Sequence, residues 1–325
     1  MKILVVGLGV IGTSYGYLFQ KAGHEVQHLL REDSPKRSLT SLSVQVLDGR
    51  QDKQGRAFKD TYQIKPCNQK DYDFIFVSVA KGQVGDVIDD LDRLAITGSL
   101  ILACGIWQTR AELDQDLGNH DYILGYPVAG GNLIENCLTF CLFDHFMLGS
   151  EEKSKLSNYQ QLVQVFDDCQ IKLEVPDDML EWIWLHMAIN AGVIAVAASS
   201  ARTGEGKAIA ENLMDSRKLL AQAVRCIRET LTIAEAKGVN LKNYGKEIWI
   251  YRMPICLSSR LMKRLFAKNL LSRKIMSLHS NLPDLLFICQ KFFDLGKKKE
   301  IPAPNFNQAY LTFWDKLKYL ENEEL

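Results

Sequence analysis

The chain opens with a continuous apolar run at residues 1–6, the pattern of a strand that is buried on both faces of a parallel sheet. Similar runs recur along the first half of the chain, and segments with helical spacing, such as residues 84–94, lie between them. This alternation predicts a doubly wound, mostly parallel sheet. Further strands are expected at residues 25–30, 74–79, 99–104 and 122–125, with 136–148 and 170–175 extending the sheet at one edge.

The pattern changes after Pro176, where helical periodicity continues to the end of the chain. Helices are expected at residues 178–200, 206–237, 243–270, 283–298 and 306–321, with a break at Pro254. The predicted fold class is therefore an α/β N-terminal Rossmann domain, residues 1–172, followed by an all-α C-terminal domain, residues 177–325. Residues 182–200 are apolar enough to suggest a membrane span, but the polar His186 and Asn190 favour a helix buried within the helical domain.

Composition narrows the classes of partner. The 39 basic and 39 acidic residues give a formal net charge of zero, which provides no reason to expect nucleic acid or an anionic membrane. None of the eight cysteines forms a C-x-x-C pair and no histidine cluster has zinc spacing, so no metal site is expected. Scattered cysteines and an N-terminal apolar run interrupted by glycines, unlike a signal peptide, predict a protein of the reducing cytoplasm.

A glycine-rich motif, G-x-G-x-x-G, follows the first predicted strand and precedes a helix expected at residues 13–22. Its residues are Gly7, Leu8, Gly9, Val10, Ile11 and Gly12. A motif in this position, inside a βαβ unit of about thirty residues, is typical of dinucleotide binding. Gly7 allows a tight turn, Gly9 lets the backbone approach a pyrophosphate, and Gly12 lets the helix pack closely on the strand. The helix N-terminus offers unpaired N–H groups to the phosphates.

The end of the second predicted strand bears on the choice of cofactor. NAD-binding proteins usually place Asp or Glu there, whereas Arg31 occupies the position here. A guanidinium suits the 2′-phosphate of NADP through charge-assisted, bidentate hydrogen bonds. Glu32 and Asp33 follow directly, so NAD stays open, and Arg31 favours NADP.

These segments together resemble the ketopantoate reductase (2-dehydropantoate 2-reductase) family. The resemblance rests on the opening MKI-x-V-x-G-x-G-x-x-G, on residues 23–31, and on a V-x-x-K region at residues 77–81, and it spans nearly the whole chain. It implies an oxidoreductase in which NADPH reduces a small anionic 2-keto acid. Ketopantoate, in pantothenate biosynthesis, is the first candidate substrate, and a homodimer is possible.

The resemblance also shows where this chain departs from the family. The catalytic lysine of the family falls on Trp182. The first Asn of the family's N-x-x-x-N signature falls on His186, whereas the second is retained as Asn190. Because these three residues are spaced i, i+4 and i+8, they lie along one face of a helix. We therefore expect His186 to donate the proton and Asn190 to hold the substrate, against the alternative of a core histidine bonded to a backbone carbonyl.

Other family positions complete the expected site. The lysine after the third strand falls on Ala80, with Lys81 one place later, and the Asn of an N-G turn falls on Cys104. Lys81 and Cys104 are thus expected near the cofactor, and Asp284, near the position of a late family carboxylate, near the substrate. Residues 126–131 (YPVAGG) are expected to line the cleft, against the alternative that their two glycines only make a turn. Two alternatives stay open: another dehydrogenase on this scaffold, such as an opine-type imine reductase, and a non-catalytic NADP(H) sensor.

Overall fold

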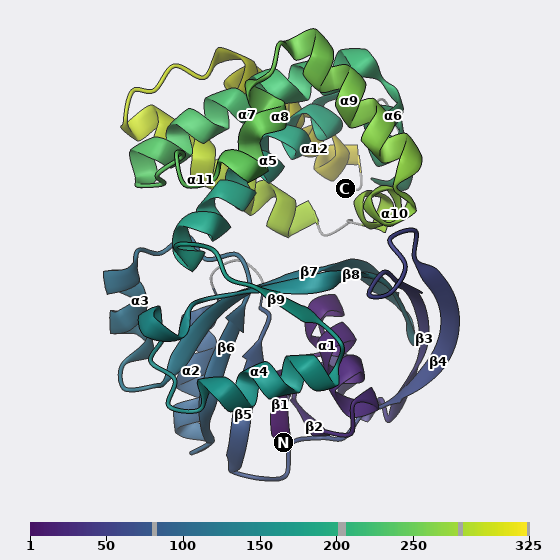
Figure 1. Ribbon diagram of the computed structural model, residues 1–325, viewed down its shortest axis with the longest axis vertical. Coiled ribbons are helices and arrows are strands. Elements are labelled where there is room, and N and C mark those ends of the chain that lie inside the picture. Colours follow the sequence, from purple (N-terminus) through teal and green to yellow (C-terminus); the bar gives the residue numbers. More distant parts are fainter. Residues whose placement is uncertain (80–82, 201–205, 279–281, 324–325) are drawn as a thin grey trace. The chain divides into compact units, whose positions relative to one another are not determined.

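The computed structural model describes residues 1–79, 83–200, 206–278 and 282–323 (Figure 1). The chain divides into two compact units, Met1–Leu180 and Glu181–Leu325. The N-terminal unit is built on a mixed, mostly parallel sheet, and the C-terminal unit is helical, which confirms the predicted fold class.

The sheet of the N-terminal unit has the strand order β2-β1-β5-β6-β7-β8-β3-β4, with β9 beside β8. Strands β2, β1, β5, β6 and β7 are parallel to one another, whereas β7 and β8 are antiparallel. The strands are β1 (Lys2–Val6), β2 (Glu25–Leu29), β3 (Ser41–Asp48), β4 (Arg56–Gln63), β5 (Asp71–Val77), β6 (Thr97–Ala103), β7 (Tyr122–Ile134), β8 (Cys137–Leu148) and β9 (Lys172–Glu174). The helices of this unit are α1 (Val10–Lys21), α2 (Val84–Arg93), α3 (Arg110–Leu117) and α4 (Tyr159–Asp168), with 3-10 turns η1 (Pro35–Ser38) and η2 (Glu151–Lys153).

The hairpin of β3 and β4 is missing from the predicted elements, although β3 carries a clear strand signal. Leu42, Val44 and Val46 are buried and alternate with exposed polar residues, which is the period-two pattern of a half-buried strand. Strand β4 is more polar and buries only Tyr62. Because β3 pairs with β8, the predicted strand 136–148 lies inside the sheet, and its placement at the edge was wrong.

The alternative of a turn at residues 126–131 is also wrong, because these residues continue β7. Gly131 pairs with Phe140 of β8. A Cβ atom at Gly131 would lie 2.2 Å from the carbonyl oxygen of Thr139, so the glycine permits close strand pairing here.

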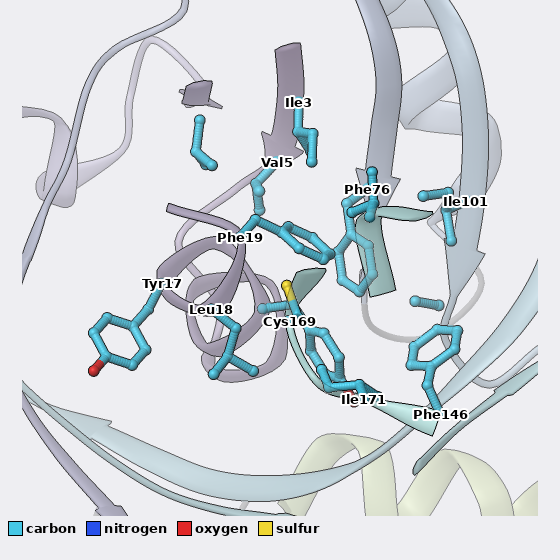
Figure 2. Packing of buried hydrophobic residues seen from close by; sticks show 14 of the residues in the cluster. Ile3, Val5, Tyr17, Leu18, Phe19, Phe76, Ile101, Phe146, Cys169 and Ile171 are labelled. Carbon is cyan, nitrogen blue, oxygen red and sulfur yellow. The ribbon is translucent and has the colours of Figure 1, made fainter. Parts of the chain in front are cut away.

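Helix α1 is enclosed on every side. Residues 12–19 are all buried, and eight consecutive helical positions point in all directions around the axis. On one side the Phe19 ring packs against that of Phe76 on β5 (Figure 2). The centroids of these two rings are 5.6 Å apart. On the other side Tyr17 meets the Tyr62 ring of the hairpin at 6.1 Å. Figure 1 shows β3 and β4 curving past α1, which accounts for this second covering layer.

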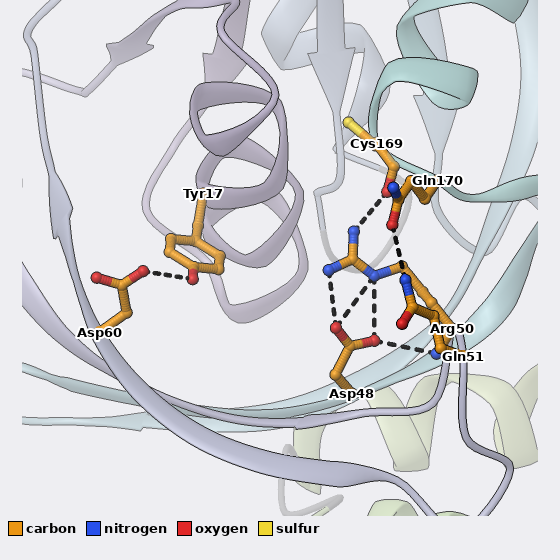
Figure 3. A network of polar contacts seen from close by, with 7 residues as sticks. All are labelled: Tyr17, Asp48, Arg50, Gln51, Asp60, Cys169 and Gln170. Carbon is orange, nitrogen blue, oxygen red and sulfur yellow. Dashed lines mark hydrogen bonds and ion pairs between the residues drawn. The ribbon is translucent and has the colours of Figure 1, made fainter.

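Polar contacts hold the hairpin in place (Figure 3). The Tyr17 hydroxyl donates to the Asp60 carboxylate on β4 at 2.8 Å. In the turn between β3 and β4, the Arg50 guanidinium donates to both oxygens of Asp48 and to the carbonyl of Cys169, which follows α4. The hairpin is therefore tied both to α1 and to the connection between α4 and β9.

A buried histidine joins β2 to the glycine turn and to the hairpin. The Nδ1 atom of His28 lies 2.8 Å from the Gly7 carbonyl oxygen, and its Nε2 atom lies 2.6 Å from the Tyr62 hydroxyl. A carbonyl can only accept, so Nδ1 carries the proton and Nε2 accepts from Tyr62. Burial lowers the pKa of His28 to about 4, which keeps the ring neutral at pH 7.

The C-terminal unit contains only helices among its described residues. They are α5 (Met179–Ser200), α6 (Gly206–Asp215), α7 (Arg217–Lys237), α8 (Gly245–Arg252), α9 (Ile255–Lys268), α10 (Leu270–Leu278), α11 (Leu282–Lys298) and α12 (Pro304–Glu323). The single helix expected at 206–237 is wrong, because Ser216 caps a new helix there by accepting from the Leu219 N–H at 3.3 Å. The break expected at Pro254 is confirmed, since α9 begins directly after it.

Helix α5 is long and apolar enough to cross a membrane, and it is the one such helix among the described residues. Half of its most apolar stretch of 18 residues is nevertheless buried inside the protein. Thr230 of α7 donates to the Ala188 carbonyl at 2.7 Å, and a Cβ at Gly192 would lie 2.7 Å from the Ile227 nitrogen. Helix α5 thus packs closely on α7, as the core helix of a helical unit does.

Acid should destabilise the protein through His28. The pKa is about 4 in the folded protein and 6.5 in the unfolded chain. The unfolded chain therefore binds the extra proton as the pH falls from 6.5 to 4, and the free energy of unfolding drops by about 3 kcal/mol across this window. Above pH 6.5 His28 adds no pH dependence. In the variant His28→Gln, we expect the free energy of unfolding to fall less between pH 6.5 and pH 4. Urea unfolding from pH 4 to pH 8 measures this difference.

His120→Gln is the matched control, because His120 is partly exposed and pairs with Asp92 at 3.0 Å. This variant should leave in place the acid-side loss that comes from the buried ring of His28. Identical pH profiles for the wild type and His28→Gln would contradict a buried neutral ring at position 28.

Candidate functional site

The carboxyl ends of the four parallel strands β2, β1, β5 and β6 form one edge of the N-terminal sheet. The register places Val6 of β1 opposite both Leu29 of β2 and Val77 of β5, and β6 ends in the same row, whereas β7 continues beyond it to Ile134. Open α/β sheets bind their ligands outside this edge. The glycine motif, Arg31 and Cys104 all follow strands that end here, so the structure brings these predicted cofactor residues to one side of the sheet.

The glycine motif forms a turn that runs into α1. Gly7 has a φ of +82°, a left-handed conformation that favours glycine. Gly9 is the N-cap residue of α1 and provides no side-chain hydrogen bond, so the first N–H groups of the helix have no side-chain cap. The helix begins at Val10, inside the motif, rather than at the expected residue 13. A Cβ at Gly9 would meet no atom within 4 Å, which leaves the backbone open to a ligand.

Gly12, in contrast to Gly9, is tightly enclosed by neighbouring side chains. A Cβ there would lie 2.8 Å from the Ser78 hydroxyl oxygen and 2.9 Å from a methyl group of Val5, so the glycine lets α1 pack directly on β1 and β5. The Ser78 hydroxyl is buried, with no hydrogen-bond partner among the described residues. Open backbone, uncapped helical amides and a spare hydroxyl are the groups that an anionic pyrophosphate needs. The residues present therefore fit a bound dinucleotide.

Two contacts hold the turn in position from β2. The Gly7 N–H donates to the Leu29 carbonyl at 2.8 Å, and the Gly7 carbonyl accepts from the neutral His28 ring. A third contact comes from η1, where the Lys36 ammonium donates to the Leu8 carbonyl at 3.0 Å. Sequence reasoning missed Ser78, His28 and Lys36, because no local pattern indicates that these side chains meet the motif.

The remaining predicted cofactor residues lie as follows. Arg31 is exposed just after β2, and its guanidinium forms no ion pair with any residue that the structure describes. Cys104 is buried directly after β6. Lys81 lies outside the described residues. The functional roles of all three stay predictions.

The predicted substrate residues belong to the C-terminal unit. The rings of Trp182 and His186 on α5 stack with centroids 5.0 Å apart and planes 10° apart. His186 and Asn190 are partly exposed, whereas Ile183 and Met187 on the other faces of the helix are buried. Asp284 is in the first turn of α11, and its side chain lies outside the described part of the structure.

Comparisons with known proteins show which sequences and folds this chain resembles. Residues 3–105 match the family model described as "Ketopantoate reductase PanE/ApbA". A search of curated proteins found no match. Among solved structures, the 2-dehydropantoate 2-reductase from Geobacter metallireducens GS-15 is 15% identical with a TM-score of 0.66, covering 97% of this chain and 100% of that one.

Two further solved structures have the same fold over almost their full length. A D-mandelate dehydrogenase, solved with NADH and anilino(oxo)acetate, is 13% identical with a TM-score of 0.67, and 99% of each chain is covered. A dimeric ketopantoate reductase from Staphylococcus aureus is 13% identical with a TM-score of 0.63, covering 99% of this chain and 100% of that one. Residues 3–105 therefore match the ketopantoate reductase family model, and the chain as a whole has the same fold as these solved ketopantoate reductases.

Proposed function

We propose that the protein is an NADPH-dependent oxidoreductase that reduces a small 2-keto acid, with ketopantoate as the first candidate substrate. The observation that carries this proposal is the open glycine turn at the carboxyl edge of the sheet. Gly7 is left-handed, Gly9 leaves the backbone open, and α1 begins without a side-chain cap. The family match at residues 3–105 includes this turn.

The residues of the turn would hold the diphosphate part of the cofactor. The N–H groups at the start of α1 point out of the helix end, where the helix dipole also favours an anion. Ser78 would supply a further donor, and Arg31, Lys81 and Cys104 complete the proposed cofactor site. When bound, a nicotinamide cofactor supplies the hydride that reduces a carbonyl carbon.

The substrate side of the reaction needs a proton donor. Negative charge develops on the keto oxygen as the carbonyl is reduced, and a positioned acid protonates it to a hydroxyl. We assign this role to a protonated His186, whose orientation is held by stacking on Trp182. Asn190, one helical turn further on, would hold the polar groups of the substrate, and Asp284 is the proposed third residue.

Two relatives support the substrate class and the assembly. The D-mandelate dehydrogenase was solved with NADH and anilino(oxo)acetate, whose name contains an oxoacetate group. The Staphylococcus aureus reductase is dimeric, so a cytoplasmic homodimer is part of the proposal. A second candidate function, a non-catalytic NADP(H) sensor, is favoured by Trp182 at the position of the family's lysine.

Gly9→Ala should separate cofactor binding from folding. The added methyl group meets no protein atom within 4 Å, and the φ of −76° suits alanine, so stability should be unchanged. The methyl group does occupy the space that the pyrophosphate would take. We expect the Kd for NADPH, measured by calorimetry, to rise by at least about tenfold. Gly245→Ala, which also meets no atom within 4 Å, is the control. An unchanged Kd for Gly9→Ala would place the cofactor elsewhere.

His186→Ala should lower turnover while leaving cofactor binding intact. Loss of a general acid costs about 100- to 10,000-fold in kcat. The measurement is NADPH oxidation with ketopantoate and a panel of 2-keto acids, with the Kd for NADPH measured in parallel and His120→Ala as the control. Unchanged turnover would exclude His186 as the acid. Tight NADPH binding by the wild type without turnover on any keto acid would favour the sensor.

A further inference from the structure

A lysine ammonium lies against the glycine turn from the side of β2. Lys36 is in η1, and Ser34 begins this 3-10 turn by accepting from the Lys36 N–H at 3.4 Å. The Nζ atom of Lys36 donates to the carbonyl of Leu8, the residue between the first two glycines of the motif, at 3.0 Å. Lys36 is partly buried, whereas the neighbouring Pro35 and Arg37 are exposed. Within η1 it is therefore the Lys36 side chain that contacts the glycine turn.

The Lys36 ammonium has capacity for a further acceptor. It carries three N–H donors, and the Leu8 carbonyl takes one of them. Burial lowers the pKa of Lys36, and no carboxylate among the described residues offsets this effect by standing beside it. A half-buried cation without an anionic partner would be stabilised by a bound anion.

The position of Lys36 in the fold indicates which anion it would bind. In Rossmann domains the adenosine ribose lies near the end of the second strand, where an acidic residue binds the 2′-hydroxyl of NAD or a basic residue accommodates the 2′-phosphate of NADP. The segment that carries Lys36 directly follows β2. The turn that Lys36 contacts is itself bonded to β2, through the Gly7 N–H and the Leu29 carbonyl at 2.8 Å.

We propose that Lys36 binds the 2′-phosphate of NADP(H) and, together with Arg31, makes this protein prefer NADP over NAD. This inference rests on the proposed dinucleotide-dependent function. It adds a cation to Arg31, which the sequence pattern singled out at the end of β2. A phosphate monoester carries more negative charge than either phosphate of the pyrophosphate, so it gains most from a desolvated ammonium.

Binding measurements with matched ligands test this role. Calorimetry on the full chain compares NADPH with NADH, and adenosine 2′,5′-bisphosphate with AMP, because each pair differs by the 2′-phosphate. Lys36→Gln should weaken the binding of NADPH and of the bisphosphate by about ten- to a hundredfold. This is the range expected for the loss of a hydrogen bond to a charged group. NADH and AMP should change by less than about twofold. Lys36→Arg should retain most of the NADPH affinity, because it keeps the charge.

Arg37→Gln is the matched control, since it removes the same charge from the adjacent exposed position. It should leave the ratio of the two affinities unchanged. Equal losses of NADPH and NADH in Lys36→Gln would overturn the inference, because Lys36 would then act on the turn or the pyrophosphate, while the proposed dinucleotide function would stand. An equal effect of Arg37→Gln, or a wild type that prefers NADH, would also overturn it. A wild type that binds neither dinucleotide would contradict the proposed function itself.

Discussion

The burial of the central residues of α1 on every side is the constraint on which the N-terminal unit depends. Because eight consecutive residues, 12–19, are buried, the helix needs apolar partners on every side, and a parallel sheet can cover only one of them. The hairpin β3–β4 and strand β8 cover the other side, and aromatic rings fill both interfaces. The start of α1 is thereby fixed by packing along the whole helix. The glycine turn at that start is therefore held in one conformation by the packing of the fold.

Close packing and the ligand site depend on the same glycines. Gly12 and Gly16 let α1 approach β1, and a Cβ at Gly16 would lie 2.7 Å from the Tyr62 hydroxyl. That hydroxyl donates to His28, which in turn donates to the Gly7 carbonyl. The hairpin, β2 and the glycine turn are thus one connected structure. The His28 ring and the Tyr62 hydroxyl are hydrogen-bonded inside the core, while the first N–H groups of α1 have no side-chain cap.

The two units differ in how closely they resemble the ketopantoate reductase family. In the N-terminal unit the glycine turn has the geometry that dinucleotide binding requires, and the family match lies there. In the C-terminal unit, Trp182 stands at the position of the family's lysine by resemblance, and its ring stacks on His186. A lysine and a histidine can both protonate a keto oxygen, but a histidine titrates near neutral pH. Under the proposed function, this exchange would change the proton donor and leave the fold intact.

Local patterns were sufficient to determine the fold class, the strand–turn–helix unit at the glycine motif, the helical second half and the break at Pro254. Each depends on residues that are neighbours along the chain, through periodicity, turn chemistry or the proline ring. Only the tertiary structure determined that β3 pairs with β8, about ninety residues away, and that β8 is therefore no edge strand. The same holds for His28 and Lys36. Their types are visible in the sequence, but the direction of a side chain toward the glycine turn is set by elements that meet only in the folded chain.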